Sequence, residues 1–533
     1  MFTQVGLERM SVLLDDPRID QLTKLIEEAT RSSEEGVRFF VEPAKGTLSR
    51  CLTKRHHLIF GRRGSGKTSL LRKAASDLTV SRRPIAFVDL EEFKGHSYPD
   101  VLISVLLKSF KKFQEWLDTA AVYPSTRTTW WDRWFRARPN VPSLNRAQCS
   151  ALSAELGTHV SDLHTLLQRP TTTEAETSAS SELSDSDELG ADVNAKLAGV
   201  GAGLSAKSAT SNRSAGTRQD KFTEDKNEIL ARNIIVYKDL FERIAKLSDG
   251  PGFLMLDDLY HLRLPDQPRV IDYFHRIVKN TSIWLKIGTV KHRSLWYVNG
   301  KPPIGMKLTD DADDIDLDVT LEKFDITKHF LMDILDQFFG ETGLALDDIL
   351  TDGARDRLVL ASGGVARDFL SIFRRSIDAT RERVGQRNLA RGEKIGVEDV
   401  NVAAGEYDSY KREEFSDDTD DQERAGLLDF FESVRTFCID TNKSNCLLTD
   451  KDLHDGDSKK IDELVDLKFL HRINPRVTVR NRPGRIYNAF MLDLSQYVGA
   501  RKLRNLELLE FWRPDRIDDL RKGGLIFLER PWL

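Results

Sequence analysis

The sequence predicts an α/β protein: a three-layer core around a parallel β-sheet, then a helical domain, then a small mixed domain near the C-terminal end. Two observations predict this architecture. Short apolar segments typical of buried strands alternate with amphipathic segments typical of helices through much of the chain. The chain also has 533 residues, 40% of them hydrophobic and 31% charged, which is enough for several folded domains.

The core is expected to begin with a strand, a glycine-rich loop and a helix. The strand is the apolar segment His56–Phe60, and the helix is Ser69–Leu78, whose apolar residues recur at helical spacing. Further strands and helices follow in the same alternation. We expect these strands at residues 84–90, 252–258 and 282–289, the helices at residues 100–120, 220–247 and 269–280, and a half-exposed outer strand at residues 315–321.

Residues 123–217 interrupt this pattern and are predicted to be a partly disordered insertion. The segment 123–140 is rich in Trp and Arg, which suits either stacking on single-stranded nucleic acid or docking on protein. The segment 170–217 has no aromatic residue and no isoleucine, so it cannot bury enough apolar surface to fold alone. A flexible hairpin around residues 193–203 is one alternative for its middle part.

Composition sets the remaining boundaries. The chain turns helical from Asp325, an acidic tract lies at Glu413–Glu423, and apolar periodicity resumes after it. We therefore expect an N-terminal segment at residues 1–46, the core at 47–324, a helical lid at 325–410, an acidic linker at 411–425, a compact module at 426–500 and a tail at 501–533. The apolar tail residues 525–528 are expected to be buried, on the body or in an oligomer interface.

Overall charge and the cysteines exclude several classes of protein. The 79 basic and 84 acidic side chains give a formal net charge of -5, so no global field draws the chain to nucleic acid or acidic lipid. The four cysteines include no CxxC pair, which argues against a disulfide framework or a zinc site. Because the sequence has no apolar run of about 18 residues and no signal-peptide pattern, we expect a cytoplasmic protein without a membrane span.

The loop Gly61–Thr68 matches GxxxxGK[ST], a phosphate-binding loop, and lies between a strand and a helix as that motif requires. Its glycines let backbone N–H groups surround phosphates, Lys67 reaches the outer phosphates, and Thr68 offers a hydroxyl to Mg²⁺. The predicted ligands are therefore ATP and Mg²⁺ in the core of a P-loop NTPase. The residues expected to bind ATP are Gly61, Arg62, Arg63, Gly64, Ser65, Gly66, Lys67, Thr68 and Ser69.

Two carboxylates end the apolar segment at residues 252–258. A carboxylate fixed at a strand end is suited to bind Mg²⁺, so Asp257 is expected to share the metal with Thr68. Asp258 would then stand where the attacking water is oriented or deprotonated. Many related ATPases have Glu at this place, and the shorter Asp258 predicts slow hydrolysis.

Two further residues are candidates for reading the outer phosphate. Thr289 closes the next strand, where it either reports the phosphate to the sheet or simply ends the strand. Arg367 follows the turn Gly363-Gly364 at the start of a helix, where it either reaches from the lid to the phosphates or lies on the surface. The residues expected to act in catalysis are Asp258, Lys67, Arg367 and Thr289.

The order of these motifs resembles the AAA+ ATPases, most of all the origin-recognition-like and STAND-like branches of prokaryotic type. The resemblance covers about residues 39–407 without the insertion, and the Gly363-Gly364-x-x-Arg367 pattern narrows it. It implies an Mg²⁺-dependent ATPase in which Thr289 is sensor 1, Arg367 is sensor 2 and Asp258 acts on the catalytic water. The resemblance does not place an arginine finger, for which Arg276 and Arg293 are candidates.

The module at residues 426–500 is expected to be winged-helix-like, as that branch often has, with two helices and a two-stranded wing near residues 477–487. Basic residues gather around this wing, namely Arg472, Arg476, Arg480, Arg482 and Arg485. The wing either contacts DNA phosphates or packs on protein, with its arginines solvated or paired to the acidic tract. The acids within the helix at residues 460–470 favour protein contact, because DNA phosphates would repel them.

Two functions are compatible with this sequence. The first is an ATP-dependent switch whose nucleotide state repositions the lid and the C-terminal domain, in protein-regulated signalling or defence, with a protein partner or self-assembly. The second is a DNA-binding initiator or loader ATPase of the replication or transposition type. They differ in what the basic wing contacts.

Overall fold

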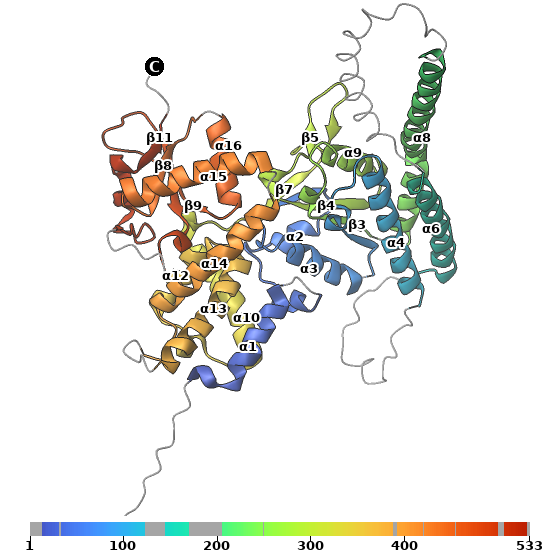
Figure 1. The fold of residues 1–533 in the computed structure, drawn as a ribbon. Coiled ribbons are helices and arrows are strands. Elements are labelled where there is room, and N and C mark those ends of the chain that lie inside the picture. Colours follow the sequence, from blue (N-terminus) through green and yellow to red (C-terminus); the bar gives the residue numbers. More distant parts are fainter. Residues whose placement is uncertain are drawn as a thin grey trace, which may run out of the picture.

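The structure, a computed structural model, describes residues 13–30, 34–80, 82–122, 144–169, 205–248, 250–386, 392–418, 421–453, 455–498 and 506–529. Figure 1 shows three parts, which we call the core, the lid and the terminal module, with the lid helices α12 and α13 beneath the terminal module. Within the described ranges, no helix combines the length and the apolar character needed to cross a membrane.

The core is built on a five-stranded sheet whose strands pair in parallel. Its strands are β1 (His57–Phe60), β2 (Ile85–Asp89), β3 (Gly252–Asp257), β4 (Ile283–Thr289) and β7 (Asp313–Asp316), in the spatial order β2-β3-β4-β1-β7. Parallel strands present their carboxyl ends at one edge, so the loops after β1, β2, β3 and β4 meet there. The predicted half-exposed strand at residues 315–321 is shorter in the structure and ends at Asp316.

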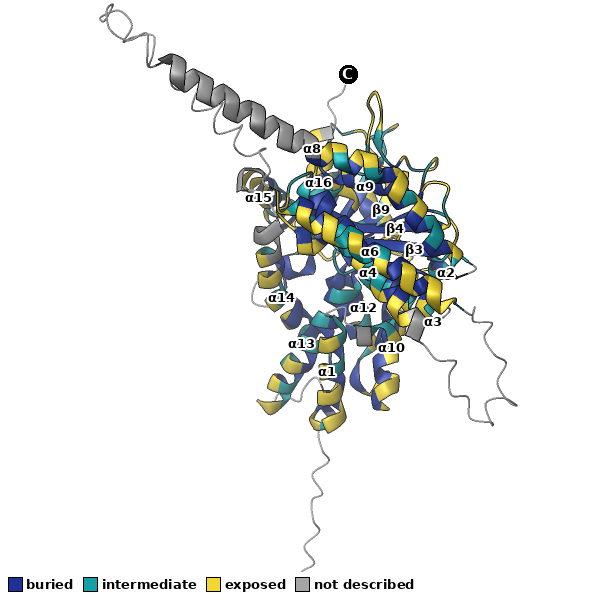
Figure 2. Ribbon diagram, turned by 90° about the vertical axis from the view of Figure 1, so that its right-hand side faces the viewer, coloured by how far each residue is buried: buried dark blue, intermediate teal, exposed yellow. Residues whose placement is uncertain are grey.

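Helices cover both faces of this sheet, which confirms the predicted α/β class with a parallel sheet. One face packs on α2 (Thr47–Cys51) and α3 (Lys67–Val80), and the other on α4 (Asp100–Val122) and α9 (Gln267–Val278). Alternate residues of β1 serve the two layers, because Ile59 faces α3 while Leu58 and Phe60 face the opposite cluster. The central strands β3 and β4 are accordingly dark blue, and therefore buried, in Figure 2.

Part of the predicted insertion at residues 123–217 belongs to the folded core. Helix α6 (Arg146–Leu167) packs along α4 and buries Cys149, Leu152 and Leu156. Helix α8 (Ser205–Lys246) begins earlier than the predicted 220–247 and contacts α6 and α9. The Trp-rich residues 123–140 and the possible hairpin at 193–203 lie outside the described residues.

The lid consists of one helix that precedes the core in the sequence and several that follow it. The helices after the core are α10 (Phe324–Thr342), α11 (Leu346–Ile349), α12 (Asp352–Ser362), α13 (Ala366–Gly385) and α14 (Val397–Asp418). Helix α1 (Pro17–Thr30) packs on α10 and α13 through Ile19, Leu22 and Ile26, so this part of the N-terminal segment belongs to the lid.

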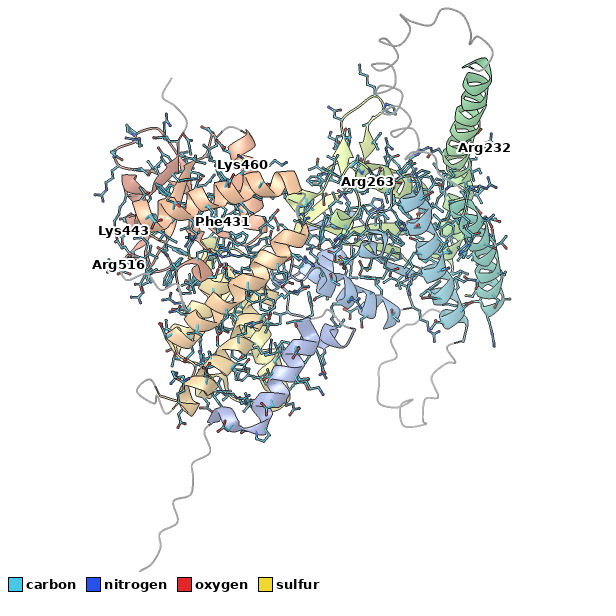
Figure 3. The ribbon with its side chains drawn as sticks, viewed as in Figure 1. Arg232, Arg263, Phe431, Lys443, Lys460 and Arg516 are labelled. Atoms are coloured by element: carbon cyan, nitrogen blue, oxygen red, sulfur yellow. The ribbon has the colours of Figure 1, made fainter. Side chains whose placement is uncertain are left out.

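The terminal module is a four-stranded sheet with two helices. Its elements are α15 (Asp421–Thr436), β8 (Cys446–Asp450), α16 (Asp455–Asp466), β9 (Leu470–Val477), β10 (Tyr487–Leu492) and β11 (Ile526–Leu528), with sheet order β11-β8-β10-β9. The predicted tail therefore completes the sheet through β11, and its Leu525 is buried there. In Figure 3, Phe431 lies on α15, and its buried ring packs 4.5 Å from the ring of Phe469.

Two predicted segments of the terminal region have a different structure. The acidic linker at residues 411–425 is largely helical, since α14 runs to Asp418 and α15 starts at Asp421. The expected wing strands near residues 477–487 lie mostly in the loop between β9 and β10. A short two-stranded hairpin, β5 (Tyr297–Val298) with β6 (Ile304–Gly305), follows β4 in the core.

Candidate functional site

The glycine-rich loop connects β1 to α3 and borders a cavity of about 190 Å³. Gly64 and Gly66 have φ angles of 87° and 97°, a region that residues with a side chain rarely adopt. The cavity is lined by Arg63, Gly64, Ser65, Gly66, Lys67, Thr68 and Ser69 of the predicted motif. The loop therefore has the curled backbone and the helix N-terminus that bind phosphate groups.

Lys67 lies inside this loop and is only 5% exposed. Its Nζ donates to the carbonyl oxygens of Gly61 and Arg62, at 2.9 Å and 3.2 Å. Burial lowers the pKa of the Lys67 ammonium, and the carboxylates of Asp258 and Asp257 oppose that shift. These two acids are therefore the nearest charge partners of the lysine.

Asp257 and Thr68 lie together at the end of β3, as the predicted metal pair requires. The Asp257 carboxylate is 1% exposed and accepts a hydrogen bond from the Thr68 side chain. Burial raises the pKa of Asp257 to about 7, and the charge of Asp258 adds to the rise. A hydroxyl and a carboxylate are hard oxygen donors, so the residues present fit Mg²⁺.

Gly288 on the neighbouring strand β4 makes room for this carboxylate. A methyl group at Gly288 would overlap Oδ1 of Asp257. The same oxygen accepts the backbone N–H of Asp258, with N and O 3.0 Å apart. The order of the strands and the lack of a side chain at Gly288 therefore fix the position of the Asp257 carboxylate.

Asp258 lines the cavity next to the phosphate-binding loop. Its backbone is left-handed, with φ 55° and ψ 47°, which an aspartate tolerates at some cost in conformational energy. Glu91, Tyr260 and His261 line the same part of the cavity and were not predicted from the sequence. A sequence signal for Glu91 existed, because two glutamates directly follow the second strand of the core.

Thr289 does not line the cavity, in contrast to its predicted phosphate-reading role. Its side chain is fully buried and its hydroxyl is hydrogen-bonded to Ser294. Of the two arginine-finger candidates, Arg276 lies 3.9 Å from Asp272, and Arg293 lies over the Tyr260 ring, 5.3 Å from its centroid. Tyr260 in turn faces Lys67, whose Nζ is 5.9 Å from the ring centroid.

Arg367 lines the cavity from the lid. Its backbone N–H donates to the carbonyl oxygen of Gly64, with N and O 3.2 Å apart. A Cβ added to Gly64 would lie 2.8 Å from Cβ of Arg367 and 3.0 Å from Cγ1 of Val365. The start of α13 is therefore in direct contact with the phosphate-binding loop.

Part of the cavity lining is apolar and was not predicted as part of the site. It is formed by the segment before α2 and by the lid helix α10, with the lining residues Phe39, Phe40, Val41, Pro43, Phe330, Ile334 and Phe338. Phe39 stacks on Phe338 with ring centroids 4.2 Å apart. An aromatic compartment next to a phosphate-binding loop suits a planar nucleobase.

Arg62 does not line the cavity, in contrast to its predicted phosphate contact. It links the phosphate-binding loop to the segment after β7 and to the lid turn. Its backbone N–H donates to Asp318 at 2.8 Å, and its guanidinium donates to the carbonyl oxygens of Val319 and Gly363, at 2.9 Å and 3.1 Å. A methyl group at Gly363 would overlap the imidazole of His471 from β9. The loop, the lid turn and the terminal module therefore meet at one point.

Three of the five arginines around the predicted wing, for which DNA contact was one alternative, pair with acids of the terminal module. Arg472 lies 2.5 Å from Asp462, Arg482 lies 3.1 Å from Glu529, and Arg485 lies 3.1 Å from Asp450. Arg476 and Arg480 are exposed. One expectation was that these arginines pair with the acidic tract at residues 413–423. The three described pairs are made with other acids.

No family model and no curated protein match the chain. Among solved structures, the chain is similar to the Orc1 protein of Aeropyrum pernix, which was solved in complex with DNA. That match has 13% sequence identity, covers 88% of each chain and has a TM-score of 0.33. The functional assignments below therefore rest on the residues of this chain.

Proposed function

We propose that this protein is a nucleotide-dependent switch that binds ATP with Mg²⁺ and hydrolyses it. The observation that supports this proposal is the shared cavity, where the phosphate-binding loop, the acid pair at the end of β3 and Arg367 of the lid line one space or border it directly. The phosphates, the metal ion and the lid would therefore contact one another at a single site.

In this proposal the loop N–H groups and Lys67 hold the phosphates, and the aromatic compartment holds the adenine. Thr68 and Asp257 hold Mg²⁺, which when bound neutralises charge on the phosphate oxygens. Lys67 must exchange its hydrogen bonds with Gly61 and Arg62 for phosphate oxygens. Asp258 is placed to orient the attacking water at the outer phosphate.

The switch follows from the contacts of the loop with the lid and the terminal module. Phosphates that enter the loop alter the surroundings of Gly64, whose carbonyl group bonds to Arg367. A shift of the loop would also move Arg62, which is hydrogen-bonded to the carbonyl oxygen of Gly363. His471 of the terminal module packs against Gly363. Loop, lid turn and terminal module thus form a connected set of contacts that a nucleotide can bias.

The test of nucleotide binding is Lys67→Ala, with Lys73→Ala as the matched control. Lys73 lies on the same helix and pairs with Asp77 at 3.0 Å on the surface. We expect Lys67→Ala to weaken Mg-ATP binding by about 100-fold or more in calorimetry, while Lys73→Ala stays within about 3-fold of the parent protein. Equal affinity of Lys67→Ala and parent would refute the site assignment.

We further propose a role in protein-regulated signalling or defence, exerted on a protein partner or through self-assembly when the terminal module moves. Light scattering with and without Mg-ATP tests self-assembly directly. A mass independent of nucleotide in every condition would exclude self-assembly as the output.

DNA binding is the second candidate, favoured by the exposure of Arg476 and Arg480 near the same end of the terminal sheet. If it is correct, duplex DNA binds with a strong salt dependence that falls in the Arg476→Ala/Arg480→Ala variant. Arg232→Ala is the control, because this exposed arginine lies on α8 in the core. Identical DNA affinity in all three proteins would exclude this surface.

A further inference from the structure

A second carboxylate reaches the cavity from the strand next to β3. Strand β2 pairs with β3 in parallel, with Asp89 opposite Asp257. The turn η3 (Leu90–Phe93) continues from β2 and places Glu91 in the cavity lining beside Asp258. The chain therefore supplies two acids to the place where the outer phosphate is expected, one from each of two adjacent strands.

Asp258 alone is poorly equipped for proton transfer from water. Its side chain is short, and it directly follows Asp257, the expected Mg²⁺ ligand. Its left-handed backbone and its N–H bond to Asp257 also restrict where the carboxylate points. A group that receives a proton needs both reach and freedom to turn toward the water.

Glu91 has both properties. Its backbone is fixed, because its N–H donates to Oδ1 of Asp89 at 3.0 Å and caps the turn. Its longer side chain is 57% exposed, and its Oε1 lies 3.9 Å from Nε2 of His261, which also lines the cavity. The adjacent Glu92 differs, since it pairs with Lys108 at 2.8 Å and does not line the cavity.

We propose that Glu91 is a further catalytic residue, the general base for the water that attacks ATP. This inference rests on the proposed ATP hydrolysis. The water oxygen forms a bond to the γ-phosphorus, and the bond from that phosphorus to the β,γ-bridging oxygen breaks with its electron pair left on ADP. The water proton passes to the Glu91 carboxylate and then to solvent, while Asp258 orients the same water.

The experiment compares Glu91→Gln with the matched control Glu92→Gln in the full chain. General-base catalysis contributes about 10² to 10⁴ in rate, so we expect Glu91→Gln to lower steady-state phosphate release by at least about 100-fold. Affinity for Mg-ATP should stay within about 3-fold, and the purified variant should retain ATP rather than ADP after incubation and gel filtration. Glu92→Gln should match the parent protein in all three measurements.

Two outcomes separate this inference from the proposed function. If the parent protein neither binds nor hydrolyses Mg-ATP, both are overturned. If the parent hydrolyses ATP and Glu91→Gln does so within about 3-fold, only the role of Glu91 is overturned. Glu91→Gln should keep the melting temperature of the parent protein, and Glu91→Asp should keep part of the ATPase activity. These two results would show that the loss of activity in Glu91→Gln comes from the missing base and not from misfolding.

Discussion

Lys411 of the lid and Asp493 of the terminal module form a fully buried ion pair, with Nζ and Oδ2 2.7 Å apart. The same carboxylate oxygen lies 2.7 Å from Nε2 of His471, whose ring packs against the lid turn at Gly363. Neither side chain of the ion pair is more than 2% exposed. Separating the lid from the terminal module therefore requires water to reach charges that are now shielded.

Removing one partner of this pair should release the terminal module. In Lys411→Met, the buried Asp493 carboxylate keeps its hydrogen bonds with His471 and Ser495 but loses its ammonium partner, which we expect to cost about 3–5 kcal/mol. Hydrogen exchange of α14 and β10 measures the loss. Lys459→Met is the control, because its exposed pair with Glu463 at 3.5 Å should contribute less than about 1 kcal/mol. Equal protection in the two variants would contradict the importance of the buried pair.

Gly64→Ala should impair nucleotide binding more than backbone strain explains. Gly64 and Gly46 have φ angles of 87° and 89°, so alanine strains both positions alike. Only at Gly64 does the new methyl group meet the lid, at Arg367 and Val365, whereas at Gly46 nothing lies within 4 Å. We expect at least a 10-fold loss of Mg-ATP affinity for Gly64→Ala and less than about 2-fold for Gly46→Ala, by calorimetry. Similar losses would mean that lid contact is irrelevant.

The aromatic compartment should recognise the base and not the phosphates. We expect Phe40→Ala to weaken ATP binding by about 10-fold, because a stacked ring contributes roughly 1–1.5 kcal/mol. Affinity for Mg-tripolyphosphate should be unchanged, since Phe40 lines the cavity with an apolar ring that offers phosphates no hydrogen bond. Competition titrations with both ligands measure the difference. A parallel loss for tripolyphosphate would place the defect in the loop instead.

Asp466 should make the docking of α16 depend on pH. Burial, reinforced by the charge of Asp318, raises the pKa of Asp466 to about 7, and Arg62 and the Asp462–Arg472 pair also face it. An unfolded aspartate titrates near 3.9, so the folded state holds an extra proton between about pH 4 and 7. The contribution of Asp466 to stability therefore falls as pH rises through this range.

The Asp466→Asn side chain stays neutral at every pH, so the free energy of unfolding of this variant relative to the parent protein should rise by about 2–3 kcal/mol between pH 5 and pH 8. Urea unfolding followed by a probe in the terminal module measures this difference. A difference that is the same at both pH values would show that Asp466 does not titrate in this range.

Sequence reasoning succeeded where function depends on consecutive residues. The strand, glycine loop and helix around Lys67 are specified locally, and an apolar strand ending in acids placed Asp257 beside Thr68. For Thr289 the sequence left two roles open, because the direction of a side chain at a strand end depends on its neighbours, here Ser294.

Other parts of the site depend on segments that are distant along the chain. Glu91 and Asp258 line one cavity only because β2 is the sheet neighbour of β3. Arg482 and Arg485 of the terminal module pair with Glu529, which follows β11, and with Asp450 of β8, and the sequence does not state how these strands pair. Helix α6 has ordinary helical composition, but its place on α4 becomes visible only once the core is assembled.

Because α1 packs on the lid, a bound nucleotide would contact both the lid and the core. The aromatic compartment is made by α10 and by the segment that leads from α1, while the phosphate loop and the acids belong to the core. A nucleotide that contacts both would act as a cross-link between two bodies, with its sugar as the bridge. Polyphosphate would contact the lid only through Arg367, whereas the intact nucleotide would also contact α10, so it should hold the core and the lid together more firmly.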